Sequence, residues 1–185
     1  SKRYGDTVQL IRADGFKIVR QIDIQIGSDN AVGICKSMGL GLIGFANAYE
    51  ELKPDLLVLL GDRFELLSAA SAALISKIPV AHIHGGEVTT GAYDDAIRHS
   101  ITKMSHLHFT STAEYRQRVI QLGECPDRVF NVGALGIDNI DRHTPCAKED
   151  IESILGMKLG ERNILVTFHP ETLSHKEDIG LAELL

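Results

Sequence analysis

Short runs of apolar residues, each ending in polar residues, constrain the fold of this 185-residue chain more than any other feature. The runs are "DLLVLLGD" (55–62), "IPVAHIH" (78–84), "HLHFTS" (106–111), "RVFNVG" (128–133) and "NILVTFHP" (163–170). Continuous apolar runs are typical of parallel strands in a sheet that is covered on both faces. We therefore expect a parallel β-sheet in an α/β fold.

Segments with apolar residues at helical spacing, or with mixed polar and apolar faces, alternate with these runs. Alternation of strands and helices at this spacing predicts a doubly wound, Rossmann-like sheet. A polar stretch with a proline, "DRHTPCAKED" (141–150), indicates a domain boundary. The expected helices are 31–53, 64–76, 94–104, 112–122, 148–155 and the start of another at 174–185.

Composition excludes some classes of function. The net charge of −6 argues against sequence-independent binding to nucleic acid, which needs a basic surface. No uninterrupted apolar run approaches the roughly 18 residues of a membrane span. Cys35, Cys125 and Cys146 are far apart and lack the spacing of a metal or redox motif, so we expect a cytoplasmic protein.

Polar residues follow each expected strand, and ligands of open α/β sheets bind beyond the carboxyl ends of strands. Asp62 follows the first run; it can cap the next helix or serve as a carboxylate in a cleft. Arg63 can bind a phosphate or pair with a neighbouring acid. His169 follows the last run and is held extended by Pro170, so it is either a cleft residue or a solvent-exposed turn residue.

The stretch "HIHGGE" (82–87) allows a metal site or an acid–base site. His82 and His84 are two residues apart on a strand and share a face. With Glu87 or Asp94 they could ligate zinc. The more favoured interpretation makes His82 a buried, hydrogen-bonded residue and lets His84 meet the cleft.

The segment "YDDAIRHS" (93–100) predicts a helix whose first turn contains acids. Asp95 fits a capping role. Asp94 and Arg98 are four residues apart, as are Asp95 and His99, so each pair shares a helix face. Facing a cleft, such a pair could hold a sugar hydroxyl and a phosphate.

Several motifs together resemble the UDP-N-acetylglucosamine 2-epimerase family, and more closely its hydrolysing, sialic-acid-pathway branch. They are "GDRFE" (61–65), "HIHGGE" (82–87), "DDAIRHSITK" (94–103), "FNVGALGIDNI" (130–140) and "TFHPET" (167–172). The resemblance implies two Rossmann-like domains in a GT-B-like arrangement, with the nucleotide sugar between them. Residues 1–143 would be an N-terminal domain without its first strand. Residues 144–185 would be a linker and the first strand–helix unit of the second domain, so we expect an internal piece of a longer enzyme.

The reaction that the resemblance implies needs no cofactor and no metal. A base removes the proton on C2 of the sugar while UDP leaves C1, and water then adds to the 2-acetamidoglucal. The resemblance makes Asp62, Glu87 and Asp94 the candidate catalytic carboxylates, with His84 at a position where many relatives have a glutamate. By the same resemblance Arg98 and His169 would bind phosphate or assist the departure of UDP, and Arg63 stays a further candidate contact to UDP. Family members are commonly dimers or tetramers, so we expect a homo-oligomer.

Three alternatives remain open from the sequence. The first is a non-hydrolysing 2-epimerase, which keeps UDP on the product. The second is a metal-dependent hydrolase that uses His82, His84 and Asp94. The third is a non-catalytic module that binds a nucleotide sugar.

Overall fold

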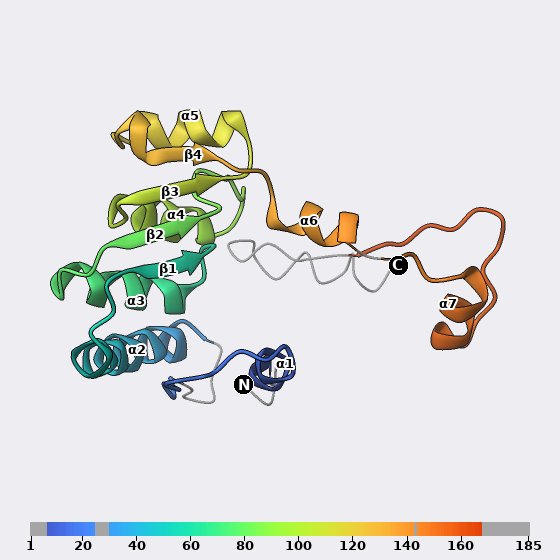
Figure 1. The fold of residues 1–185 in the computed structure, drawn as a ribbon, viewed down its shortest axis with the longest axis horizontal. Helices are drawn as coiled ribbons and strands as arrows, with labels where there is room; N and C mark the ends of the chain where they lie inside the picture. The colour runs from blue at the N-terminus through green and yellow to red at the C-terminus, as the bar shows by residue number, and fades with distance from the viewer. Residues whose placement is uncertain (1–6, 25–29, 143, 168–185) are drawn as a thin grey trace.

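The computed structural model describes residues 7–24, 30–142 and 144–167. Within them, strands and helices alternate along the chain from residue 31 to residue 131 (Figure 1). The helices are α1 (Thr7–Ala13), α2 (Ala31–Leu52), α3 (Phe64–Ile75), α4 (Asp94–Lys103), α5 (Ala113–Gln121), α6 (Leu135–Arg142) and α7 (Lys148–Leu155). The strands are β1 (Leu57–Leu60), β2 (Val80–Ile83), β3 (Leu107–Thr110) and β4 (Val129–Asn131), the last preceded by a 3-10 turn at Pro126–Arg128.

The strands form one parallel sheet in the order β1-β2-β3-β4. This confirms the predicted α/β, Rossmann-like fold. All four arrows in Figure 1 point to the side from which the chain leaves for α6. The carboxyl ends of the strands therefore lie along one edge of the sheet, where the polar residues that follow the strands come together.

The two faces of the sheet are buried to different extents. A row of paired residues runs across the sheet on one face and is almost fully buried: Leu59, His82, His108 and Val129. On the other face Val58 and Leu60 are more than half exposed. The expectation of cover on both faces is therefore wrong for β1. Among the described residues β1 is also the edge strand of the sheet, with β2 as its single neighbouring strand.

Small residues let α3 pack closely against the sheet and against α2. Four alanines of this helix are 0–3% exposed: Ala69, Ala70, Ala72 and Ala73. The hydroxyl of Tyr49 in α2 donates to the carbonyl of Ala69 at 3.2 Å, and the Ser68 hydroxyl donates to the carbonyl of Met38 at 2.9 Å. Burial of these apolar side chains is the main favourable term that holds the layer together.

Among the described residues, α2 is the helix with the length and apolar composition to cross a membrane. Those two properties alone are weak evidence, because core helices share them. Its buried positions include Gly41, whose Cα approaches Ser68 of α3 so closely that an added Cβ would lie 3.2 Å from the Ser68 Cβ. The helix begins where the Asn30 side chain accepts a hydrogen bond from the Gly33 N–H at 2.9 Å.

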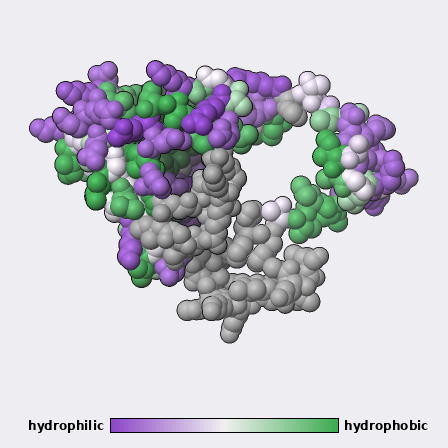
Figure 2. Space-filling view, turned by 90° about the horizontal axis from the view of Figure 1, so that it is seen from below, coloured by the Kyte–Doolittle hydropathy of each residue, from purple (hydrophilic) through white to green (hydrophobic). Residues whose placement is uncertain are grey.

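The C-terminal part of the described chain departs from prediction. No strand forms over residues 163–167, and Ile164 and Leu165 are 89% and 94% exposed. A strand needs a hydrogen-bonded neighbour, and no described strand pairs with this segment, so the predicted strand is wrong over these residues. The short helices α1 and α6 are further elements that the apolar pattern did not predict. Figure 2 shows apolar side chains on the surface around α7, away from the sheet. The predicted boundary after residue 143 stays a prediction.

Candidate functional site

The candidate site lies at the carboxyl edge of the sheet, where three turns leave neighbouring strands. Backbone hydrogen bonds extend one residue beyond the strands and fix these turns. The Gly61 N–H donates to the Ile83 carbonyl at 3.0 Å, and the His84 N–H donates to the Phe109 carbonyl at 2.8 Å. Side chains that follow β1, β2 and β3 are therefore presented together.

The side chain of Arg98 in α4 connects two of these turns by hydrogen bonds. Its guanidinium donates to Asp62 after β1, to the Glu87 carbonyl at 2.8 Å and to the Thr89 hydroxyl at 2.9 Å. The side chain is 6% exposed. A buried guanidinium with protein acceptors on both of its terminal nitrogens is suited to hold loops in place. This geometry favours a positioning role over the expected phosphate contact.

Asp62 does not cap α3, so that interpretation is wrong. The N-cap residue of this helix is Arg63, and no side chain caps it. The Asp62 Oδ2 instead accepts a hydrogen bond from Arg98, while Oδ1 has no partner among the described residues. One carboxylate oxygen thus remains available to a ligand.

Arg63 points to the surface. Its Nε donates to Glu65 at 2.7 Å, and its side chain is 71% exposed. The pair with a neighbouring acid therefore forms, and phosphate binding by Arg63 stays a prediction.

His84 and Glu87 form a close pair after β2. The His84 Nδ1 lies 2.6 Å from the Glu87 Oε1, which also accepts the Ser111 hydroxyl at 2.8 Å. Burial alone would raise the pKa of Glu87, but the hydrogen bonds from Ser111 and His84 outweigh it, so the pKa is lowered. Glu87 is therefore a carboxylate at neutral pH.

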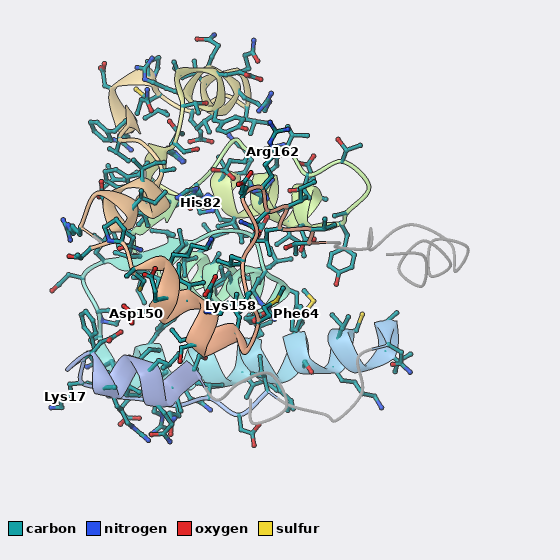
Figure 3. All side chains as sticks on the ribbon, turned by 90° about the vertical axis from the view of Figure 1, so that its right-hand side faces the viewer. Lys17, Phe64, His82, Asp150, Lys158 and Arg162 are labelled. Carbon is teal, nitrogen blue, oxygen red and sulfur yellow. The ribbon has the colours of Figure 1, made fainter. Side chains whose placement is uncertain are left out.

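His82 is buried and structural, as expected (Figure 3). Its Nε2 lies 2.8 Å from the Gly61 carbonyl, and its Nδ1 lies 3.1 Å from the Thr102 hydroxyl. Burial lowers the pKa of His82 to about 4, so the ring is neutral. Its Nε2–H donates to Gly61, and its Nδ1 accepts from Thr102.

The hydrogen bonds of His82 leave no ring nitrogen for a metal ion. Within the described ranges, no three His, Cys, Asp or Glu side chains come together in a way that could hold a metal. The geometry therefore gives no support to a ligand set of His82, His84 and Asp94.

The acids at the start of α4 have different surroundings. Asp95 does not cap the helix, because Tyr93 is the N-cap residue. Its carboxylate accepts the Thr89 N–H at 3.1 Å and lies 3.5 Å from Arg98 and 3.7 Å from His99. The capping prediction is thus wrong. Asp94 makes no hydrogen bond or ion pair with any described residue.

Several residues that support the site were not singled out as site residues from the sequence. They are Thr89, Thr102 and Ser111. Ser111 alone carried a signal, since it directly follows β3 at the predicted site edge. His169 lies outside the described residues.

Known proteins resemble this chain in sequence. A protein named GDP/UDP-N,N'-diacetylbacillosamine 2-epimerase (hydrolyzing), from Campylobacter jejuni, is 48% identical over 176 residues, which are 95% of this chain and 46% of that protein. Polysialic acid biosynthesis protein P7 of Escherichia coli is 48% identical over 172 residues, 92% of this chain and 44% of that protein. The chain thus spans less than half the length of these relatives.

Solved structures share the fold. The UDP-GlcNAc 2-epimerase of Neisseria meningitidis, bound to UDP-GlcNAc, superposes with a TM-score of 0.65 at 21% identity, over 80% of this chain and 42% of that one. The UDP-N-acetylglucosamine 2-epimerase of Rickettsia bellii gives a TM-score of 0.69 at 22% identity, over 85% of this chain and 42% of that one. The family model described as UDP-N-acetylglucosamine 2-epimerase matches residues 1–182, so the chain belongs to the UDP-N-acetylglucosamine 2-epimerase family.

Proposed function

We propose that the full-length protein is a hydrolysing UDP-sugar 2-epimerase that acts on a UDP-2-acetamido sugar. Family membership supports this proposal, as do two relatives at 38% and 48% identity whose names include "hydrolyzing". The observation that carries it is the group of Asp62, His84 and Glu87 on adjacent turns at one sheet edge. Epimerisation requires groups that exchange protons, and these residues supply them.

The proposed reaction has two stages. In the first, a base removes the C2 proton, the electron pair of that C–H bond forms a C1=C2 double bond, and UDP leaves C1 with the electrons of the C–O bond. In the second, the oxygen of water bonds to C1 and a proton is delivered to the opposite face of C2. Asp62 and Asp94 are the candidate carboxylates for one of the two proton exchanges. Two groups with different surroundings suit the two stages.

Three residues are proposed for the UDP phosphates, and the support for each differs. Arg63 is exposed and its pair with Glu65 is on the surface, where an ion pair contributes little and can be exchanged for a ligand. Arg98 acts on the site through Asp62 and the backbone of Glu87. His169 is proposed from the family motif alone.

The substituent on C4 of the sugar distinguishes two substrates. The relatives at 48% identity carry names that point to a diacetylated sugar in one case and to polysialic acid in the other. We propose UDP-N-acetylglucosamine or UDP-N,N'-diacetylbacillosamine as substrate, with N-acetylmannosamine or the corresponding 2-epimer as product. The product of the first would serve sialic acid synthesis.

Product analysis by NMR tests the function directly. The full-length protein is incubated with each UDP-sugar, and both free UDP and free 2-epimer are expected from one of them. A product that retains UDP would show a non-hydrolysing epimerase. Loss of turnover on chelation, restored by zinc, would show a metal-dependent hydrolase. Calorimetric binding of UDP without any product would show a binding module.

The compartment and the assembly are also proposals. Cys35, Cys125 and Cys146 are exposed and free, which supports a reducing, cytoplasmic compartment. A homo-oligomer, either dimer or tetramer, is expected for the full-length protein. Light scattering on the purified protein measures its mass, and a monomer would contradict this expectation.

A further inference from the structure

His84 has an unusual backbone conformation for a residue at the end of a strand. Its φ of 65° lies in the left-handed region, which non-glycine residues rarely adopt. Among the described residues, the other non-glycine residues with positive φ are Lys53 and Lys77, both of which follow helices. Left-handed residues are common there. At His84 the conformation has no such explanation, and strain of this kind concentrates at functional sites.

The tautomer of the neutral His84 ring follows from its partner. Its Nδ1 lies 2.6 Å from the Glu87 Oε1, which already accepts the Ser111 hydroxyl. Glu87 is ionised, so it can only accept at this distance, and Nδ1 must carry the hydrogen. In the neutral ring the lone pair is then on Nε2, which has no hydrogen-bond partner among the described residues. The ring is 21% exposed, so this nitrogen can be reached.

Glu87 is held firmly by groups other than His84. Its carbonyl accepts from Arg98 at 2.8 Å, and the carbonyl of Gly86 accepts from Arg118 at 2.5 Å. A carboxylate with a fixed backbone and two donors on one oxygen is suited to orient an imidazole, as in pairs of base and orienting acid.

The charged and titratable groups around this pair come from several elements. The β1–α3 turn contributes Asp62, which is bonded to Arg98 of α4. Strand β2 contributes the neutral, buried His82, and the β3–α5 turn contributes the uncharged hydroxyl of Ser111. Glu87 is thus the carboxylate in direct contact with the His84 ring.

We propose that the Nε2 of His84 is the base that removes the C2 proton of the sugar, and that Glu87 is a positioning residue that holds the ring through its Nδ1–H. The inference rests on the proposed function and assigns different roles to two of its candidate residues. The Nε2 lone pair forms the new N–H bond as the C2–H pair becomes the C1=C2 bond and UDP departs. The resulting imidazolium is paired with the Glu87 carboxylate and returns its proton to solvent.

A second group must act on the other face of C2. Its proton bonds to C2 while water bonds to C1, and the proton released from that water restores the group. Asp62 and Asp94 are the candidates for this role, because neither donates to or accepts from the His84 ring.

The test uses substitutions of His84 in the full-length enzyme. His84→Asn keeps a donor near the Nδ1 position and tolerates the left-handed backbone, but it removes Nε2. We expect kcat to fall by roughly 10²- to 10⁴-fold, the contribution of a general base, with KM little changed. His84→Glu supplies a carboxylate base instead. It should recover at least a tenth of wild-type kcat and move the acid limb of the pH profile to lower pH, because an imidazole base titrates at about pH 5–8.

The positioning role of Glu87 has its own readout. In Glu87→Gln the imidazolium loses its counter-charge, so kcat should fall by about 10-fold while KM changes little. In the double variant with His84→Asn, the Glu87 substitution should cost nothing further, because residues that act as a unit are not additive.

Each result decides between distinct conclusions. If wild-type enzyme releases UDP and folded His84→Asn keeps kcat within threefold, the base assignment is overturned while the proposed function stands. An additive loss in the double variant would overturn the positioning role of Glu87. If wild-type enzyme turns over no UDP-2-acetamido sugar, the proposed function fails and this assignment fails with it.

Discussion

The buried ring of His82 makes the stability of the protein depend on pH in a calculable way. The side chain is fully buried and bonded to Gly61 and Thr102. Burial, with smaller contributions from His108 and Arg98, lowers its pKa from 6.5 to about 4. In the unfolded chain the ring is exposed and takes up a proton with the ordinary pKa of 6.5.

The sign and magnitude follow from proton linkage. Between about pH 6.5 and pH 4 the unfolded state binds a proton that the folded state excludes, so acid favours unfolding. The stability contribution of the neutral ring is complete above pH 6.5 and is lost as the pH falls to about 4. Each pKa unit corresponds to about 1.4 kcal/mol, which gives a loss of about 2 kcal/mol by pH 5 and about 3 kcal/mol in full.

Urea denaturation of the full-length protein at several pH values measures this loss. His82→Gln is the matched variant, since its amide can still donate to the Gly61 carbonyl but does not titrate. Between pH 7.5 and pH 5 the wild type should lose about 2 kcal/mol more unfolding free energy than the variant. His108, whose pKa burial also lowers, titrates in both proteins and cancels in the comparison. Parallel stability curves for the two proteins would refute the reasoning.

Two further substitutions test the packing that supports the site. Arg98→Met leaves Asp62 without its buried counter-charge and should lower the unfolding free energy by about 3 kcal/mol, with a smaller loss for Arg98→Lys; urea midpoints that match wild type would contradict the positioning role. Gly86→Ala should cost about 2 kcal/mol, because φ is +82° and the added Cβ would lie 2.4 Å from the Tyr115 carbonyl. Gly136→Ala in α6, with nothing within 4 Å of the added Cβ, is the control for that variant and should leave the melting temperature unchanged or slightly raised, because alanine has the higher helix propensity; equal melting temperatures for both alanine variants would argue against strain at Gly86.

The order of strands and helices from residue 31 to residue 131 could be predicted from the sequence, because it depends on local periodicity. The segment 94–104 was expected to be helical and α4 spans Asp94–Lys103, while "HLHFTS" contains β3. The exposure of one face of β1 could not be predicted. An apolar run shows that a strand is apolar, but it does not show which elements pack on its two faces. The same limit applies to residues 163–167, whose apolar character was not enough to produce a strand without a partner.

The pairing of polar groups in the site depends on contacts across the fold. Spacing along the helix predicted a pair of Asp94 with Arg98, because residues four apart share a face. Arg98 instead bonds to Asp62, 36 residues away in sequence. A long guanidinium side chain can leave its own helix face when a turn above it presents acceptors. The sequence placed both residues at one edge of the sheet, but it could not show to which carboxylate the arginine would donate its hydrogen bonds.

The saturation of hydrogen bonds separates the groups that hold the site from those that can react. Both ring nitrogens of His82 are bonded, and both terminal nitrogens of Arg98 donate to protein acceptors, so these two side chains serve to hold the site. Asp62 keeps one oxygen without a described partner, and His84 keeps Nε2. A site of this kind is preorganised, because its reactive atoms are aimed by buried neighbours before the substrate arrives. The same network explains how an imidazole can replace the glutamate that many relatives have after β2. The hydrogen bonds that hold the turn use the backbone of Glu87 and the side chain of Asp62, and neither depends on the side chain at position 84.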